Sequence, residues 1–273
     1  MGPVTTITQV FDAVQRAKAG APAFCTNFFP VHGKVQGWID HGELLGEIRG
    51  QSAFFLRKDR DFWHLLFCAP DVAALQREIT AIPSLKTERV AVDLVGSGAV
   101  LVELLKVVES AGFRRYARLL RLARPNQPGQ LQPAEGTEVL GADKTDCQAI
   151  MDLLECSFDR YADQLPMLYE IEAVLEAHQI LTVKCDQALA ALLFFESQGF
   201  TSTVRYWVVA ERFRSHRFGS ALIRHYFTTQ SAVRRFILWV TADNENAVLK
   251  YRHYGYAPDG LLDHVLVNEM ARA

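Results

Sequence analysis

Several features that would mark a function class are missing from this 273-residue sequence. Its five cysteines form no Cys-x-x-Cys pair and are odd in number, so neither a zinc site nor a disulfide scaffold is indicated. His253 and His264 do not pair at any metal-ligand interval. The longest strongly apolar run, 188–195, is far too short to span a bilayer. No basic segment followed by an apolar core opens the chain. We therefore expect a cytoplasmic protein with no metal and no membrane partner.

The charge balance also lacks any excess of basic residues. Lys and Arg number 29 against 31 Asp and Glu, a net charge of −2. The halves differ, with 16 − 12 = +4 for 1–124 and 13 − 19 = −6 for 125–273. No polycationic character is available to hold nucleic acid. The acidic second half would suit a cationic, amine-bearing substrate, although ordinary surface variation is the simpler explanation.

Proline and glycine are concentrated at one place that divides the chain. Three prolines and two glycines fall within 124–137, where they suppress both helix and strand. We interpret 125–136 as a linker between a first domain at 1–124 and a second at 137–273. Two domains also agree with the length, at ~150 residues per domain.

Hydrophobic periodicity in the second domain predicts a mixed α/β architecture. The predicted order is strand, two helices, three strands, helix, strand, helix, strand, which implies a mixed sheet with helices on both faces. The predicted strands are 138–140, 180–185, 189–196, 201–210, 236–241 and 261–268, and the predicted helices are 146–161, 167–178, 218–230 and 246–254.

The first domain echoes this order faintly. A hairpin at 53–57 and 62–68 is followed by a helix at 71–81 and a strand at 89–94. The helical segment 104–113 closes on Gly and an aromatic residue, as does 248–256. We therefore predict that the first domain is a diverged copy of the second.

A basic loop before a small-residue helix start is the most informative segment. Gly219 and Ser220 open the helix predicted at 218, and a helix start with small residues can bind phosphate through free N–H groups. Guanidinium groups suited to a pyrophosphate crowd this region: Arg205, Arg212, Arg214, Arg217 and Arg224.

This loop resembles the acetyl-CoA motif of the GNAT superfamily, Gln/Arg-x-x-Gly-x-Gly/Ala. Arg214 and Gly219 match it, whereas Arg217 stands where the first glycine is expected. The resemblance implies a GNAT-like fold, two such domains in tandem, and acetyl-CoA as cofactor. Carried over to this sequence, the cofactor-binding residues are Val208, Val209, Ala210, Arg214, Ser215, His216, Arg217, Phe218, Gly219, Ser220, Asn246 and Tyr251.

A second signature of the same family follows. Asn246 begins the predicted helix as its cap, and Tyr251 lies four residues before Gly255, as the family's general-acid tyrosine does. In the first domain the residue four before Gly112 is Val108, and no basic glycine-rich loop follows 62–68. The first copy would thus lack both the loop that binds the cofactor and the general-acid tyrosine.

The resemblance implies an N-acetyltransferase that moves an acetyl group to a primary amine by direct attack in a ternary complex. Val208 N–H would polarise the thioester carbonyl, and Tyr251 would protonate the departing sulfur. Glu196 is our first candidate for the base that deprotonates the amine, and His178 the second. The expected partner is a small-molecule or peptide amine, and a homodimer is the assembly considered.

Two other readings are open from the sequence. One is a GNAT-fold binding or regulatory protein in which Arg217 blocks the cofactor. The other is a tandem-fold transferase that uses aminoacyl-tRNA, which requires a basic track that the −6 charge of the second half does not favour.

Overall fold

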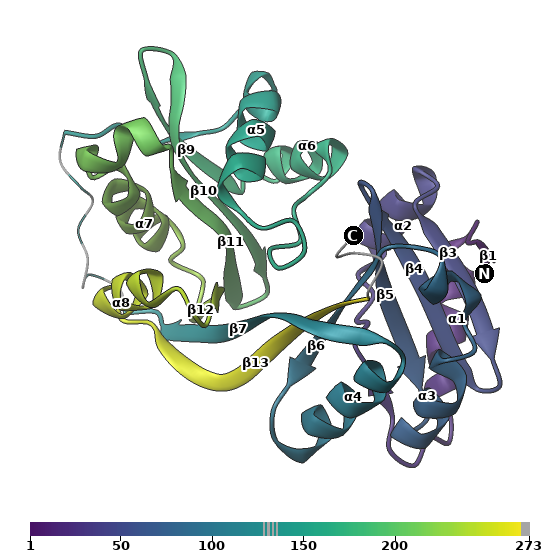
Figure 1. Cartoon of the computed structure of the whole chain (residues 1–273). Coiled ribbons are helices and arrows are strands. Elements are labelled where there is room, and N and C mark those ends of the chain that lie inside the picture. Colours follow the sequence, from purple (N-terminus) through teal and green to yellow (C-terminus); the bar gives the residue numbers. More distant parts are fainter. Residues whose placement is uncertain (128, 130–131, 133, 135, 269–273) are drawn as a thin grey trace. The chain divides into compact units, whose positions relative to one another are not determined.

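The computed structural model describes residues 1–127, 129, 132, 134 and 136–268 (Figure 1). The chain forms two compact units. The first contains Met1–Leu119 together with the segment from Leu261 onward, and the second contains Leu120–Gly260. Among the described residues, no helix has both the length and the apolar character needed to cross a membrane.

The first unit is built on a sheet in the order β1-β3-β4-β5-β6-β13, with β2 paired to β5. Its neighbours are antiparallel except β5 and β6, which run parallel. In chain order the elements are β1 (Gly2–Pro3), α1 (Ile7–Lys18), β2 (Cys25–Thr26), α2 (His32–Asp40), β3 (Leu44–Arg49), β4 (Ser52–Asp59), β5 (Phe62–Ala69), α3 (Val72–Ile79), the 3-10 helix η1 (Pro83–Lys86), β6 (Val90–Gly96), α4 (Gly98–Ser110) and β7 (Phe113–Pro125).

The second unit repeats this plan with the strand order β7-β12-β11-β10-β9-β8. Here β11 and β12 are the parallel pair. Its elements are β8 (Leu140–Gly141), η2 (Lys144–Asp146), α5 (Cys147–Ser157), α6 (Leu168–Glu176), β9 (Ile180–Cys185), β10 (Ala188–Gln198), β11 (Thr201–Val209), η3 (Glu211–His216), α7 (Phe218–Thr229), β12 (Arg235–Thr241), α8 (Glu245–His253) and β13 (Ala257–Asn268).

Both units therefore share the order helix, helix, three strands, helix, strand, helix, strand, and the predicted mixed α/β tandem fold is confirmed. The unit limits differ from the predicted division at 125–136. The strand beside β6 is β13, from the other end of the sequence, and the strand beside β12 is β7. Strand pairing rather than chain order thus defines each unit. Five residues of the predicted linker lie outside the described residues.

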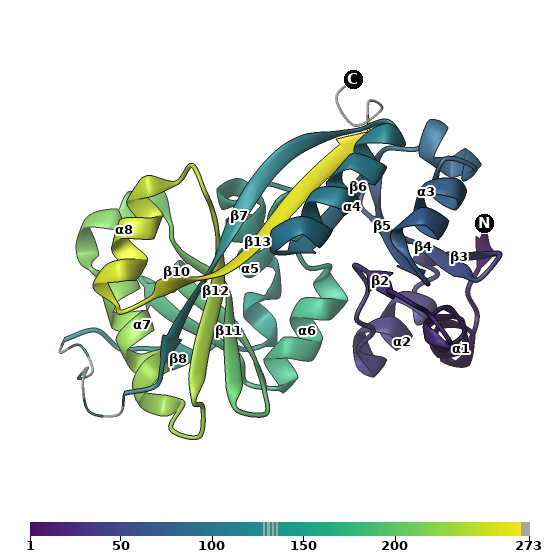
Figure 2. The same ribbon diagram turned by 90° about the horizontal axis from the view of Figure 1, so that it is seen from below.

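Helices cover both faces of the sheet in each unit (Figures 1 and 2), and an apolar core lies on each face. In the second unit, β10 places Leu193 and Phe195 in the core with α7, and Leu192 and Phe194 in the core with α5 and α6. Successive side chains of a strand point to opposite faces, so a strand buried on both faces needs an uninterrupted apolar sequence. This explains the apolar run at 188–195, since β10 lies inside the sheet between β11 and β9.

Candidate functional site

The two parallel strands of the second unit separate part of the way along their length. β11 pairs with β12 only from Thr201 opposite Arg235 to Val204 opposite Leu238. A β-bulge follows at once, because Phe194 faces Tyr206 and Phe195 faces Val204, which leaves Arg205 as the extra residue. Bulges bend and re-aim a strand. Beyond it, β11 continues beside β10 and leaves a gap on the side of β12, which we call the strand gap.

The register decides which backbone groups face the strand gap. Ala210 N–H donates to Ala190 O at 2.9 Å, so this pair is hydrogen-bonded across β10 and β11. Hydrogen-bonded and non-bonded pairs alternate in an antiparallel ladder. Val208, opposite Leu192, therefore turns its N–H and C=O toward β10, whereas Trp207 and Val209 turn theirs into the strand gap.

This geometry corrects two sequence-based assignments. Val208 N–H is directed at β10, so Trp207 and Val209 replace it as the backbone groups available to a ligand. Ala210 N–H is already used within the sheet. The bulge at Arg205 shifts the alternation by one residue, and a sequence pattern does not reveal where a bulge falls.

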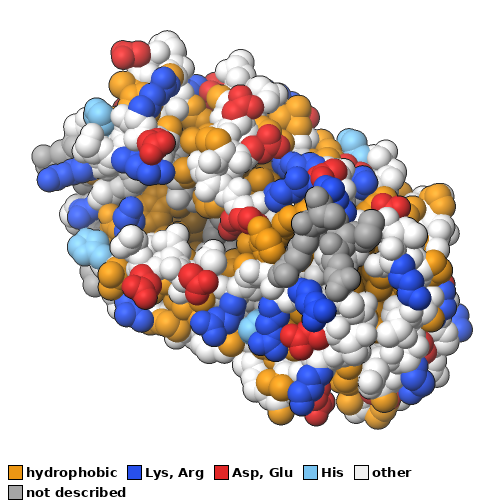
Figure 3. Space-filling view, viewed as in Figure 1, with side chains coloured by type: hydrophobic (Ala, Val, Ile, Leu, Met, Phe, Trp, Pro, Cys, Tyr) orange, Lys and Arg blue, Asp and Glu red, His pale blue; other side chains and the backbone are white. Residues whose placement is uncertain are grey.

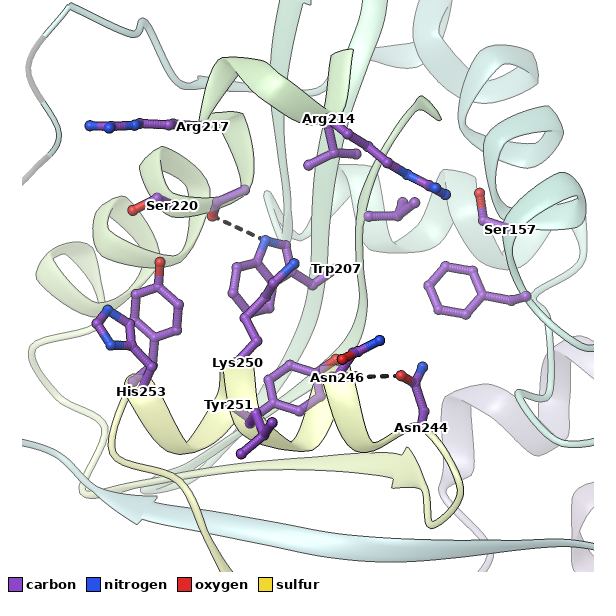
Figure 4. A pocket seen from close by; sticks show the side chains of 17 residues that line it. Ser157, Trp207, Arg214, Arg217, Ser220, Asn244, Asn246, Lys250, Tyr251 and His253 are labelled. Atoms are coloured by element: carbon purple, nitrogen blue, oxygen red, sulfur yellow. Dashed lines mark hydrogen bonds between the residues drawn. The ribbon is translucent and has the colours of Figure 1, made fainter. Parts of the chain in front are cut away.

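A cavity of about 1010 Å³ opens beside the strand gap (Figure 4). It is bounded by the end of α5, the last residues of β11, the loop before α7 and one side of α8. The residues that line it are Ser157, Phe158, Trp207, Val208, Val209, Arg214, Arg217, Gly219, Ser220, Asn244, Asn246, Ala247, Leu249, Lys250, Tyr251, His253 and Tyr254.

The N-terminus of α7 forms one wall of this cavity. The residue before it, Arg217, has φ of 59°, the left-handed region that glycine adopts most easily, and its side chain makes no capping hydrogen bond. The backbone thus keeps the conformation that suits a glycine, although arginine is present. In Figure 4 the Arg217 side chain extends away from Trp207 and Tyr251, so it does not close the cavity.

Gly219 stands where a side chain would be crowded. A Cβ at this position would lie 3.3 Å from Trp207 Nε1 and 3.3 Å from Val209 Cγ2. Trp207 Nε1 also donates to the carbonyl of Gly219 at 3.1 Å. The helix start is therefore held close against the last residues of β11, which places its free N–H groups beside the strand gap.

Every charged side chain that lines the cavity is a potential cation: Arg214, Arg217, Lys250 and His253. No aspartate or glutamate among the described residues belongs to the lining. Figure 3 shows Lys and Arg side chains gathered around a hollow in the region of α7 and α8. This distribution favours a polyanionic ligand.

Tyr251 lies on α8 with its side chain directed into the cavity (Figure 4). Its ring contacts Trp207 at 5.7 Å and Tyr256 at 6.2 Å between centroids. Burial, with a smaller contribution from the charge of Asp163, raises the pKa of Tyr251 to about 12. The phenol therefore keeps its proton near neutral pH, as a proton donor must.

Asp163, which the sequence analysis did not single out, lies on the connection between α5 and α6. Burial raises the pKa of the Asp163 carboxyl to about 6, the repulsion from Asp159 adding to it. The connection is tied to β11, since Tyr206 Oη donates to Asp163 O at 3.0 Å and to Gln164 O at 2.7 Å. Asp163 is thus a carboxyl group with a near-neutral pKa that interacts electrostatically with Tyr251.

The two bases predicted from sequence do not line the cavity. Glu196 lies on β10 opposite Thr203 and acts electrostatically on Arg205. His178 is exposed on the turn between α6 and β9, where its N–H donates to Leu175 O at 2.9 Å. Neither is positioned by the structure toward Tyr251.

Some of the remaining predicted residues line the cavity and others do not. Asn246 lines the cavity from the first turn of α8, but the cap is Asn244, whose side chain accepts from Ala247 N at 3.1 Å. The predicted residues that line the cavity besides it are Val208, Val209, Arg214, Arg217, Gly219, Ser220 and Tyr251. The predicted residues outside the lining are Ala210, Ser215, His216 and Phe218, and the His216 ring stacks on Phe218 with centroids 5.3 Å apart.

The lining includes residues that sequence reasoning missed, chiefly Ser157, Trp207, Lys250 and His253. Lys250 and His253 are three residues apart on α8, a spacing that places them on one side of a helix and could have indicated them. No sequence pattern indicated Ser157, because its place in the lining depends on where α5 ends.

Comparison with known proteins finds one family model that matches the part of the chain containing this site. Residues 147–256 match the model of the Acetyltransferase (GNAT) family. No curated protein sequence gives a match. The solved structure of a tandem GNAT protein from the clavulanic acid biosynthesis pathway, without AcCoA, is similar over 97% of each chain, with a TM-score of 0.64 at 12% identity.

Two further structures are similar over most of the chain. A GCN5-related N-acetyltransferase from Sphaerobacter thermophilus has a TM-score of 0.60 at 15% identity and covers 96% of this chain and 91% of its own. An acetyltransferase from the GNAT family from Colwellia psychrerythraea has a TM-score of 0.57 at 11% identity, with coverage of 97% and 98%. At these identities the likeness concerns the fold.

Proposed function

We propose, from the premise that residues 147–256 are a GNAT-type acetyltransferase domain, that the second unit transfers an acetyl group from acetyl-CoA to a primary amine. Acyl transfer with acetyl-CoA is the general activity of this family. The observation that carries the proposal for this chain is the strand gap. There, the backbone of Trp207 and Val209 faces a cavity that also contains Tyr251.

The residues present fit such a cofactor. The amide groups of a pantetheine arm need partners of the kind that Trp207 and Val209 turn into the strand gap. A pyrophosphate suits the uncapped start of α7, where Gly219 lets an anion approach the backbone. Arg214 and Lys250 add positive charge to the lining of the cavity.

The chemical step needs one group that donates a proton and one that accepts a proton. The thioester supplies the activated acetyl group, and a neutral amine nitrogen attacks its carbonyl carbon while the carbon–sulfur bond breaks. Tyr251 donates its proton to the departing sulfur. Asp163 lies outside the cavity lining and its Oδ2 accepts from Asp159 N at 2.8 Å, so it would take the proton that the amine loses by way of a water molecule. Their pKa values of about 12 and about 6 suit a donor and an acceptor near neutral pH.

Release of free thiol from acetyl-CoA, measured across a panel of amines, tests the proposal. We expect turnover with at least one amine, and calorimetry should detect acetyl-CoA binding. Gly219→Glu should abolish that binding, because the new carboxylate would meet Trp207 and Val209 and repel phosphate. Gly141→Glu, on β8 with open space around it, is the matched control and should bind normally.

Binding without turnover for any amine would contradict the enzymatic assignment and favour a regulatory GNAT-fold protein. Normal binding to the Gly219→Glu variant would place the cofactor elsewhere.

A further inference from the structure

The first unit contains a gap equivalent to the strand gap of the second. β5 and β6 occupy the positions of β11 and β12 in the shared element order. Their parallel pairing is confined to Trp63 opposite Val90 and His64 opposite Ala91. Beyond it, β5 continues beside β4 to Cys68. The first unit therefore has the same opening in its sheet where the second unit presents free backbone.

In the first unit this opening is filled by the chain itself. Asn27 Nδ2 donates to Leu65 O on β5 at 2.9 Å and to Asp93 O on β6 at 3.1 Å. Asn27 Oδ1 accepts from Phe67 N at 2.7 Å. One carboxamide thus connects the two separated strands and satisfies three backbone groups in the gap.

The neighbouring residue continues the closure. Thr26 Oγ1 donates to Phe67 O at 2.7 Å, and β2 pairs Cys25 with Ala69 and Thr26 with Cys68. Leu65 and Phe67 alternate along β5 in the same way as Trp207 and Val209 along β11. The backbone groups that are open in the second unit are therefore used internally in the first.

The difference arises in one connection of the fold. The segment between α1 and α2 contains β2 and Asn27, whereas the corresponding segment between α5 and α6 contains Asp163 and is attached through Tyr206. The segment between α1 and α2 lies in the gap between β5 and β6, where it forms the extra short strand β2. The segment between α5 and α6 contains no strand among the described residues and leaves the backbone of Trp207 and Val209 open.

The phosphate end of the first unit is closed as well. Asp71 caps α3, which corresponds to α7, and its side chain accepts from Ala74 N at 2.7 Å. A carboxylate there uses the N–H group that a phosphate would need and repels its charge. Val108, fully buried on α4, stands where the second unit has Tyr251.

We propose that residues 25–27 are a built-in plug of the first unit, and that Asn27 takes the place of a pantetheine amide. The chain then binds one acetyl-CoA rather than two. The stoichiometry rests on the proposed function of the second unit, whereas the plug itself does not.

Hydrogen–deuterium exchange on the full chain tests the plug without any ligand. Replacement of Asn27 by Ala removes the acceptor of Phe67 N, so exchange at the Phe67 amide should accelerate at least about fivefold. Asn126→Ala is the matched control: Asn126 Nδ2 also donates to two carbonyls, those of Gln230 and Val233, but in the second unit. If the Asn27→Ala chain does not fold, Asn27→Asp is the second variant. It keeps an acceptor for Phe67 N but sets a carboxylate oxygen against the carbonyls of Leu65 and Asp93, so exchange around Asp93 should rise more than at Phe67.

Addition of acetyl-CoA separates this inference from the proposed function. Protection should increase at 205–221 and stay unchanged at 63–69, and calorimetry should give one site per chain, falling to none in Gly219→Glu. Two sites, one remaining site in that variant, or new protection at 63–69 would overturn the inference. If acetyl-CoA increases protection at no segment, the proposed function is contradicted. The plug is then still tested by the exchange rate of the Phe67 amide in the Asn27→Ala variant. An unchanged exchange rate of the Phe67 amide in Asn27→Ala would refute the plug.

Discussion

A buried histidine in the first unit should make the stability of the protein depend on pH. His64 on β5 is 3% exposed and lies between two carboxylates. Its Nε2 is 3.1 Å from Asp59 Oδ2, and its Nδ1 is 3.4 Å from Asp93 Oδ2. Both ring nitrogens face a carboxylate oxygen, an arrangement that favours the doubly protonated imidazolium form of the ring.

The direction of the effect follows from the pKa of His64. Burial opposes the charged ring, but the hydrogen bonds to Asp59 and Asp93 outweigh it and raise the pKa above its ordinary value. The unfolded chain has a histidine pKa of ~6.5. The stabilisation is therefore complete below ~6.5 and is lost as pH rises through the folded pKa. Burial, with the nearby charge of Asp93, raises the pKa of Asp263 well above its usual value, so its contribution also falls as pH rises.

The size of the effect can be worked from these contacts. A hydrogen bond to a charged group contributes ~1.5–3 kcal/mol, and removal of one partner of a buried ion pair costs ~3–5 kcal/mol. Asp59 keeps Arg57 at 3.7 Å and Arg60 at 2.8 Å after His64 is removed, whereas Asp93 loses its charged partner. We therefore expect the lower value, about 3 kcal/mol, for His64→Phe below pH 6.5.

Urea unfolding between pH 5.5 and 9 measures this prediction. The difference between the parent protein and His64→Phe should be largest at the acid end and should shrink as pH rises. His41→Gln, at an exposed histidine of the same unit, is the control and should leave the pH dependence unchanged. A difference that is constant with pH, or that grows toward alkaline pH, would refute the imidazolium assignment.

Three further predictions concern the second unit. Tyr251→Phe removes only the hydroxyl, so kcat should fall ~10²–10⁴-fold with the acetyl-CoA Kd nearly unchanged, and unaltered turnover would remove this residue from the mechanism. Asp163→Asn should abolish the rise of kcat/KM around pH 6, since a group with a pKa of about 6 limits activity below it; persistence of that limb would assign the base elsewhere. Arg217→Gly relieves a left-handed backbone and should raise stability by ~0.5–1 kcal/mol in thermal unfolding, while acetyl-CoA affinity falls a few-fold and less so at high salt. A decrease in stability of this last variant would contradict the strain argument.

Local sequence patterns predicted much of the second unit. The helix predicted to begin at residue 218 begins at Phe218, and the strand predicted at 180–185 is Ile180–Cys185. These elements depend on periodicity and on residues that favour helix starts, which act over a few positions. Tyr251 and Gly219 belong to local motifs, and both line the cavity.

Features that depend on register or on distant segments could not be predicted in this way. The bulge at Arg205 transfers the open backbone groups from Val208 to its neighbours, although the strand itself was predicted at 201–210. Asp163 lies in an irregular connection whose position is fixed by Tyr206. Asn27 lies within the first 50 residues, for which the periodicity gave no assignment, and its partners are 38 to 66 residues away.

The place of β13 has a consequence for how the protein is made. Asn268 at its end accepts from Val90 N at 3.0 Å and donates to Leu85 O and Glu88 O, so it closes the sheet against a segment synthesised some 180 residues earlier. A nascent chain stalled before residue 261 would hold a first unit with an unpaired β6 edge, exposed to aggregation until the ribosome has finished the second unit. Truncation near residue 261 should for the same reason damage the unit farther away in the sequence.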